Sequence, residues 1–214
     1  MEELELRGHA GLPLPCVLHG EETRCAVVLP GAAHSQNRLG GTPARPDLHL
    51  VRALLQEQGW SVLEVWWDAA TFDRDRPDDW LLDNARAALA GVRAHGREPA
   101  LLVGRSLGTM ALAALRTAEP ERARLPSIWV APLLDQQPVR ETLRHGGGRR
   151  FVLCGGRDEA YDAGVATLLH RRGSEVVVLE HASHGLDCGD AVATARALVG
   201  ALERLREFVG SLGE

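Results

Sequence analysis

The sequence predicts an α/β protein, a three-layer sandwich whose mostly parallel central sheet is covered by helices on both faces. From about residue 26 onward, short apolar runs alternate with longer helix-like segments, which is the pattern of repeated βαβ units. The apolar runs are mostly uninterrupted, as expected for strands that are buried on both faces. The opening stretch differs, because residues 4–7 and 16–18 flank a turn with Gly and Pro and predict an antiparallel hairpin at the sheet edge.

The elements that follow can be placed from the same patterns. The predicted central strands are residues 25–29, 61–66, 100–103, 128–130, 151–153 and 175–179. Helices are predicted over residues 48–58 and 79–95, and each of them is followed by a glycine that ends it, Gly59 and Gly96 respectively. Apolar spacing predicts a last helix over 190–209. With no internal repeat or long linker, residues 1–214 are predicted to form one domain, with an edge hairpin at 1–24 and a core at 25–210.

Composition excludes several classes of protein. The chain is 45% hydrophobic and 25% charged, which is typical of a soluble protein with a buried core. A net charge of −5 without a basic run argues against nucleic-acid and anionic-membrane partners. All 24 basic residues are arginine, which excludes a lysine nucleophile or Schiff base.

Four separated cysteines, Cys16, Cys25, Cys154 and Cys188, match neither a disulfide framework nor a zinc site. The first eleven residues lack the basic and apolar regions of a signal peptide, and no apolar run is long enough to span a membrane. We therefore expect a cytoplasmic protein with reduced thiols.

The main chemical signal is a G-x-S-x-G sequence at residues 104–108, Gly-Arg-Ser-Leu-Gly. It directly follows the apolar run 100–103 and precedes a helix-like segment rich in small residues. A serine on such a tight strand-to-helix turn needs glycines on either side for space, and the helix N-terminus stabilises negative charge beside it. A glycine-flanked serine in an ordinary turn is the simpler alternative.

In this context, the motif resembles the nucleophile elbow of the α/β-hydrolase superfamily, with Ser106 as the nucleophile. The superfamily order of serine, acid and histidine is also present, because Asp158 follows the run 151–153 and His184 follows the run 175–179. The resemblance implies that His184 takes the proton of Ser106 and that Asp158 orients the imidazole.

Other residues compete for two of these roles. Asp135 and Asp162 are alternatives for the acid, and the simpler interpretation of Asp158 is the cap of a helix beginning near residue 159. His181 is the alternative to His184.

The resemblance also implies an oxyanion hole built from the backbone N–H groups of Leu107 and Ala32. His34 and Trp67 are candidates for the wall of the substrate pocket, although a solvated histidine and a core tryptophan are the simpler interpretations. Arg105 could contact an anionic substrate, but a salt bridge to a neighbouring helix is commoner for such a residue.

Only residues 132–150 separate two central strands at the point where many relatives insert a cap. The chain therefore resembles small capless serine hydrolases, similar to the dienelactone-hydrolase-like and small carboxylesterase-like groups, with serine where dienelactone hydrolases use cysteine. The resemblance implies an open site that hydrolyses a small carboxylic ester or thioester, with the acyl substrate either free or borne on a carrier or protein. It implies no cofactor, and the scattered His and Cys residues predict no metal site. Two alternatives stay open: a non-catalytic binding or scaffold protein, and an acyltransferase or cyclase on the same fold.

Overall fold

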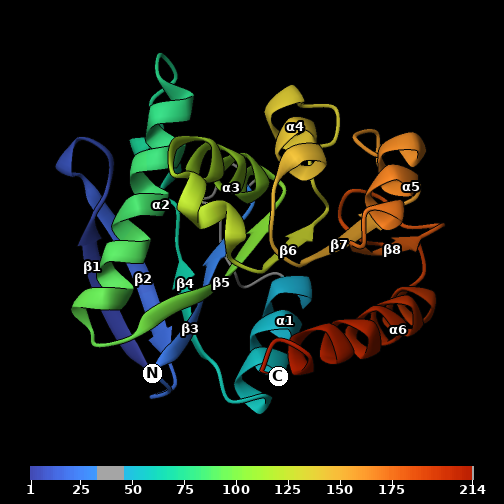
Figure 1. Cartoon of the computed structure of the whole chain (residues 1–214), viewed down its shortest axis with the longest axis horizontal. Helices are drawn as coiled ribbons and strands as arrows, with labels where there is room; N and C mark the ends of the chain where they lie inside the picture. The colour runs from blue at the N-terminus through green and yellow to red at the C-terminus, as the bar shows by residue number, and fades with distance from the viewer. Residues whose placement is uncertain (33–45, 214) are drawn as a thin grey trace.

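The computed structural model describes residues 1–32 and 46–213, which form one eight-stranded sheet flanked by helices (Figure 1). The strands are β1 (Glu2–Arg7), β2 (Pro13–His19), β3 (Arg24–Leu29), β4 (Ser61–Val65), β5 (Glu98–Arg105), β6 (Ser127–Val130), β7 (Arg150–Gly155) and β8 (Glu175–Leu179). The helices are α1 (Pro46–Glu57), α2 (Pro77–Ala94), α3 (Leu107–Ala118), α4 (Gln137–His145), α5 (Ala163–Arg171) and α6 (Ala191–Gly210). Short 3₁₀ turns occur at η1 (His9–Gly11), η2 (Ala69–Thr71) and η3 (Pro120–Arg124).

The sheet order is β1-β2-β4-β3-β5-β6-β7-β8. β1 pairs antiparallel with β2, and β2 pairs antiparallel with β4, whereas every later pair is parallel. The predicted hairpin and the predicted mostly parallel sheet are both confirmed. Because β3 to β8 run the same way, the loops that leave them meet at one carboxyl edge, which is where open α/β sheets bind ligands.

Two apolar cores lie on the two faces of the sheet. Helices α2, α3, α4 and α5 cover one face, and α1 and α6 cover the other (Figure 1). The first core holds, among others, Trp80 and Leu89 of α2 and Leu112 of α3. The second core is built on Leu55 of α1 and Phe208 of α6. This layering explains the uninterrupted apolar strands, since both faces of the central strands are buried.

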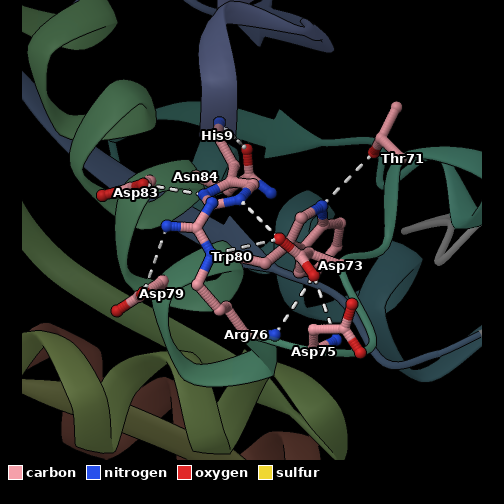
Figure 2. Close-up of polar contacts among 9 residues, drawn as sticks. All are labelled: His9, Thr71, Asp73, Asp75, Arg76, Asp79, Trp80, Asp83 and Asn84. Atoms are coloured by element: carbon pink, nitrogen blue, oxygen red, sulfur yellow. Dashed lines mark hydrogen bonds and ion pairs between the residues drawn. The ribbon is translucent and has the colours of Figure 1, made fainter.

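The hairpin is fastened to α2 by a buried histidine in the turn η1 (Figure 2). Only 5% of His9 is exposed, and its Nδ1 lies 2.8 Å from Asp83 Oδ2 while its Nε2 lies 3.2 Å from Asp73 Oδ2. The His9 backbone N–H also donates to Asn84 Oδ1 at 3.0 Å. These bonds connect the hairpin to α2 and to the segment between η2 and α2.

Helix α5 begins a few residues later than the helix that the sequence suggested after Asp158. A helix beginning near residue 159 was an alternative explanation for Asp158, but α5 begins at Ala163 and its cap is Asp162. The Asp162 Oδ1 accepts the Val165 N–H at 2.9 Å, which satisfies one unpaired donor of the first turn. Asp158 is therefore not the cap of this helix.

Both ends of the described chain lie at the amino edge of the parallel strands (Figure 1). Glu2, the first residue of β1, pairs with Leu18 near the end of β2, and β2 runs antiparallel to β4. At the other end, a Cβ added to Gly213 would lie 3.3 Å from Nη1 of Arg24, the first residue of β3. Among the residues described, no helix is both long and apolar enough to cross a membrane.

Candidate active site

The turn from β5 into α3 carries Ser106 in a backbone conformation that non-glycine residues rarely adopt. Its φ is 49° and its ψ is −114°. The glycines of the motif are required by close packing, because a Cβ on Gly108 would lie 2.0 Å from the carbonyl oxygen of Leu29 in β3. A Cβ on Gly104 would lie 2.7 Å from the Gly108 carbonyl oxygen. The motif thus lets α3 start directly against the strands while the serine side chain stands out of the turn.

Ser106, His184 and Asp158 are joined by two short hydrogen bonds. The Oγ of Ser106 lies 2.8 Å from Nε2 of His184, and Nδ1 of His184 lies 2.7 Å from Oδ2 of Asp158. Only 5% of the Asp158 side chain is exposed, against 36% for His184. Since an ionised carboxylate only accepts hydrogen bonds, this contact assigns the neutral imidazole proton to Nδ1 and leaves Nε2 free to accept the serine proton.

Backbone contacts hold the loop after β7 against the loop after β8. A Cβ on Gly155 would lie 2.3 Å from the carbonyl oxygen of Ser183, so only glycine allows this approach. The Arg157 N–H donates to the Ala182 carbonyl at 2.9 Å. The second carboxylate oxygen of Asp158, Oδ1, accepts the Ala160 N–H at 2.9 Å. These contacts hold the Asp158 carboxylate beside the imidazole of His184.

The competing residues lie elsewhere. Asp135 is exposed ahead of α4, and its carboxylate accepts a hydrogen bond from the Gln136 side chain at 2.9 Å. Asp162 is used as the cap of α5. His181 is exposed and lines a surface hollow of about 400 Å³ on the α6 side of β8. The hydrogen-bonded series is therefore the one formed by Ser106, His184 and Asp158.

The two backbone donors expected for an oxyanion hole belong to segments that adjoin Ser106. Leu107 is the first residue of α3, so its N–H has no acceptor within the helix. Ala32 follows β3 in the loop that begins at Pro30. This loop touches the elbow, because a Cβ on the neighbouring Gly31 would lie 3.1 Å from Cβ of Ser106.

The two candidates for the pocket wall have different outcomes. His34 lies outside the described residues. Trp67 is 3% exposed and belongs to the core beneath α2, where its ring centroid lies 4.8 Å from that of Trp80. Trp67 packs against Trp80 with the two rings tilted by 39°, so it is buried in the core instead of forming an open pocket wall.

Arg105 makes the salt bridge that was the simpler of its two expected roles. It is 3% exposed, its Nε donates to Asp47 Oδ2 of α1 at 2.7 Å, and its Nη2 donates to the His184 carbonyl at 3.4 Å. No local sequence signal identifies Asp47 as its partner, because 58 residues separate them and an acid at a helix start usually serves the helix itself.

The sequence also did not predict a role for Thr109 at this site. It is fully buried in α3, its hydroxyl donates to the Ser106 carbonyl at 2.6 Å, and the same oxygen accepts the Leu133 N–H at 3.3 Å. Thr109 therefore ties the elbow to the segment after β6. A threonine one turn into a helix offers no sequence signal for such a role.

Comparison with known proteins identifies the fold. No protein-family model matches the sequence, and no curated protein matches it. An α/β serine hydrolase without a lid from Xanthomonas campestris superposes with a TM-score of 0.69 at 19% identity, over 99% of this chain and 92% of that chain. An α/β serine hydrolase homologue from Coxiella burnetii has a TM-score of 0.69 at 18% identity, over 98% and 96% of the two chains. A dienelactone hydrolase from Anabaena variabilis gives 0.64 at 16% identity, over 96% and 97%.

The chain therefore has the α/β-hydrolase fold. It has the form without a lid, because the segment between β6 and β7 contains only the short helix α4. The predicted fold class and the expected absence of a cap are both confirmed.

Proposed function

We propose that this protein is a serine hydrolase that cleaves small carboxylic esters or thioesters through an acyl-enzyme. The observation that carries the proposal is the continuous hydrogen-bonded series from Ser106 Oγ through His184 to Asp158, with distances of 2.8 and 2.7 Å. A serine hydroxyl is a weak nucleophile until a base takes its proton, and this geometry provides the base. The hydrolases and the esterases among the structures of similar fold agree with the proposal.

The reaction would proceed in two halves. Ser106 Oγ attacks the acyl carbonyl as its proton passes to His184 Nε2, and Asp158 stabilises the imidazolium that forms. The N–H groups of Leu107 and Ala32 stabilise the tetrahedral oxyanion. His184 then gives the proton to the departing alkoxide or thiolate, which leaves the acyl group on Ser106. Water, deprotonated by His184, releases the acid and restores the serine.

The preference for a small acyl group follows from the missing cap. Lidded relatives cover a long chain with apolar surface, whereas here the only insertion between β6 and β7 is the helix α4 of nine residues. The His184 side chain is also 36% exposed, so the reacting atoms lie near the surface. Such a site suits a short acyl ester, or an acyl group presented on a carrier or protein.

A covalent probe tests the proposal directly. The intact mass of the protein is measured after exposure to a fluorophosphonate, for the wild type and for Ser106→Ala in parallel. We expect one adduct on the wild type and none on the variant, followed by turnover of acetyl and butyryl p-nitrophenyl esters by the wild type alone. A folded wild type that neither labels nor hydrolyses would refute the proposal and favour a non-catalytic scaffold.

A control variant separates the serine of the elbow from other serines. Ser183 lies one residue before His184 and is exposed, with its hydroxyl accepting the Gly185 N–H at 3.2 Å. Ser183→Ala should label at least half as fast as the wild type. Loss of the adduct in Ser183→Ala, with the adduct kept in Ser106→Ala, would assign the reactive hydroxyl to Ser183 and not to Ser106.

A further inference from the structure

We propose that Arg105, the first variable position of the G-x-S-x-G motif, is a positioning residue for His184. This inference rests on the proposed function of the Ser106–His184–Asp158 series. Arg105 does not touch the reacting atoms; its guanidinium holds the main chain of the loop that carries the base, and Asp47 of α1 fixes the guanidinium.

The burial of Arg105 excludes direct contact with a substrate. Only 3% of its side chain is exposed, and 5% of the Asp47 side chain. A buried guanidinium needs a counter-charge, which the Asp47 carboxylate provides at 2.7 Å from Nε. This short contact anchors the planar group at one end, so the direction of its other N–H bonds is set.

The other end of the guanidinium reaches the two loops beside Ser106. Nη2 donates to the carbonyl oxygen of His184 at 3.4 Å. Nη1 lies at the β3 loop, because a Cβ on Gly31 would be 2.8 Å from it. Arg105 therefore contacts the loop of the expected oxyanion donor and the loop of the base, while its own backbone leads into the nucleophile.

The loop of His184 is held both by contacts of its own and by Arg105. Two backbone hydrogen bonds lie within the loop. The Ser183 N–H donates to the Asp187 carbonyl at 2.9 Å, and the Leu186 N–H donates to the Ser183 carbonyl at 2.9 Å. The peptide group that follows His184 is held at both ends, since its N–H, from Gly185, donates to Ser183 Oγ at 3.2 Å and its carbonyl accepts from Arg105 at 3.4 Å. Releasing the carbonyl end would loosen this peptide plane and change the direction of the imidazole toward Ser106 Oγ.

Two substitutions and a matched control test this role. Arg105→Met keeps much of the length and apolar stem but removes the guanidinium, and Arg105→Lys keeps the charge on a single head that cannot bridge both partners. Arg116→Met is the control, because Arg116 is also buried, at 4% exposed, and hydrogen-bonds backbone carbonyls of Ala123, Leu125 and Gly147 away from the site.

The measurements are kcat and KM for a short p-nitrophenyl ester, expressed per active site titrated with fluorophosphonate. We expect Arg105→Met to lower kcat per titrated site at least tenfold with KM changed less than twofold, and Arg105→Lys to recover only part of the loss. Arg116→Met should keep kcat per site within twofold of the wild type. An increase in KM at constant kcat would overturn the proposal, because Arg105 would then meet the substrate. A loss explained entirely by fewer titratable sites would overturn it as well.

Failure of the proposed function would be recognised separately. If the folded wild type neither labels nor hydrolyses esters, the hydrolase proposal fails, and the positioning role is judged by proton NMR alone. The Nδ1 proton of His184 in its 2.7 Å contact with Asp158 should give a low-field resonance that His184→Gln removes. We expect Arg105→Met to shift or broaden this resonance and Arg116→Met to leave it in place. An unchanged resonance in Arg105→Met would overturn the positioning role.

Discussion

Ser106, the proposed nucleophile, has an unfavourable backbone conformation, since its φ of 49° and ψ of −114° suit glycine far better than serine. Such a residue costs the folded state on the order of 1–3 kcal/mol. Ser106→Gly should therefore relieve strain that Ser106→Ala keeps, because alanine retains the Cβ.

We expect Ser106→Gly to be at least as stable as Ser106→Ala, with a difference of about 1 kcal/mol in the free energy of unfolding measured in urea. Both variants should fail to label with fluorophosphonate. A glycine variant clearly less stable than the alanine variant would mean that the elbow is not strained.

Gly108 fixes the distance between α3 and β3. A Cβ at this position would lie 2.0 Å from the Leu29 carbonyl oxygen, so Gly108→Ala must push helix and strand apart. We expect a loss of about 1–3 kcal/mol in the free energy of unfolding, with slower labelling of Ser106.

Gly200 in α6 is the matched control, because an added Cβ there meets nothing within 4 Å. Gly200→Ala should stabilise the protein by up to about 1 kcal/mol through helix propensity. Equal urea midpoints for the two alanine variants would contradict the packing argument at Gly108.

How far the site could be predicted depends on how local each signal is. Ser106 and its glycines follow from a motif in a strand–turn–helix context, and Asp158 and His184 follow from their order after later strands. The link from Arg105 to Asp47 joins residues 58 positions apart in two elements, and nothing in either segment specifies the other. Trp67 shows the same limit, because its burial against Trp80 results from how the loop folds onto α2.

At the scale of elements, the docking of the β1–β2 hairpin should depend on pH through His9. The hydrogen bond to Asp83 raises the pKa of His9 above its ordinary 6.5, opposed by desolvation and supported by the hydrogen bond to Asp73; the nearby Arg76 charge lowers it slightly. Because the folded-state pKa is raised, the stabilisation is complete below pH 6.5 and is lost as the pH rises through the folded-state value.

His9→Gln should therefore destabilise the protein more at pH 6 than at pH 9, as measured by urea midpoints at both values. His145→Gln is the control, because the His145 side chain is 70% exposed and solvent screens its contact with Glu141 at 3.2 Å. It should leave the pH dependence as in the wild type. A constant difference between the wild type and His9→Gln across this range would contradict the charged state of His9.

Elements were predicted more reliably than their ends. The apolar runs located β3 to β8, because strands buried on both faces have few polar positions. The starts of helices were less certain. Two aspartates, Asp158 and Asp162, precede α5, and only the tertiary contact of Asp158 with His184 decides that Asp162 is the cap. The role of His9 was not predicted either, since its two carboxylate partners come from a distant segment.

At the scale of the whole molecule, the four cysteines divide by burial. Burial raises the pKa of Cys16, Cys25 and Cys154 to about 12, which keeps these thiols protonated at neutral pH. Cys188 is only half-buried, at the start of the segment leading into α6.

Ellman's reagent should therefore titrate one thiol rapidly in the native protein and all four in urea. Cys188→Ser should remove the rapid phase and leave three thiols that react only on unfolding. Two or more rapid thiols in the native wild type would contradict the buried positions of the other cysteines.

The location of the two chain ends has a practical consequence. Ser106, Asp158 and His184 sit beyond the carboxyl ends of their strands, whereas Glu2 and Gly213 lie at the opposite edge of the sheet. An affinity tag, a fused carrier or a linker to a solid support, attached at either terminus, would project away from Ser106. Immobilised protein would thus present the carboxyl edge of its sheet to the surrounding solution, whichever end is tethered.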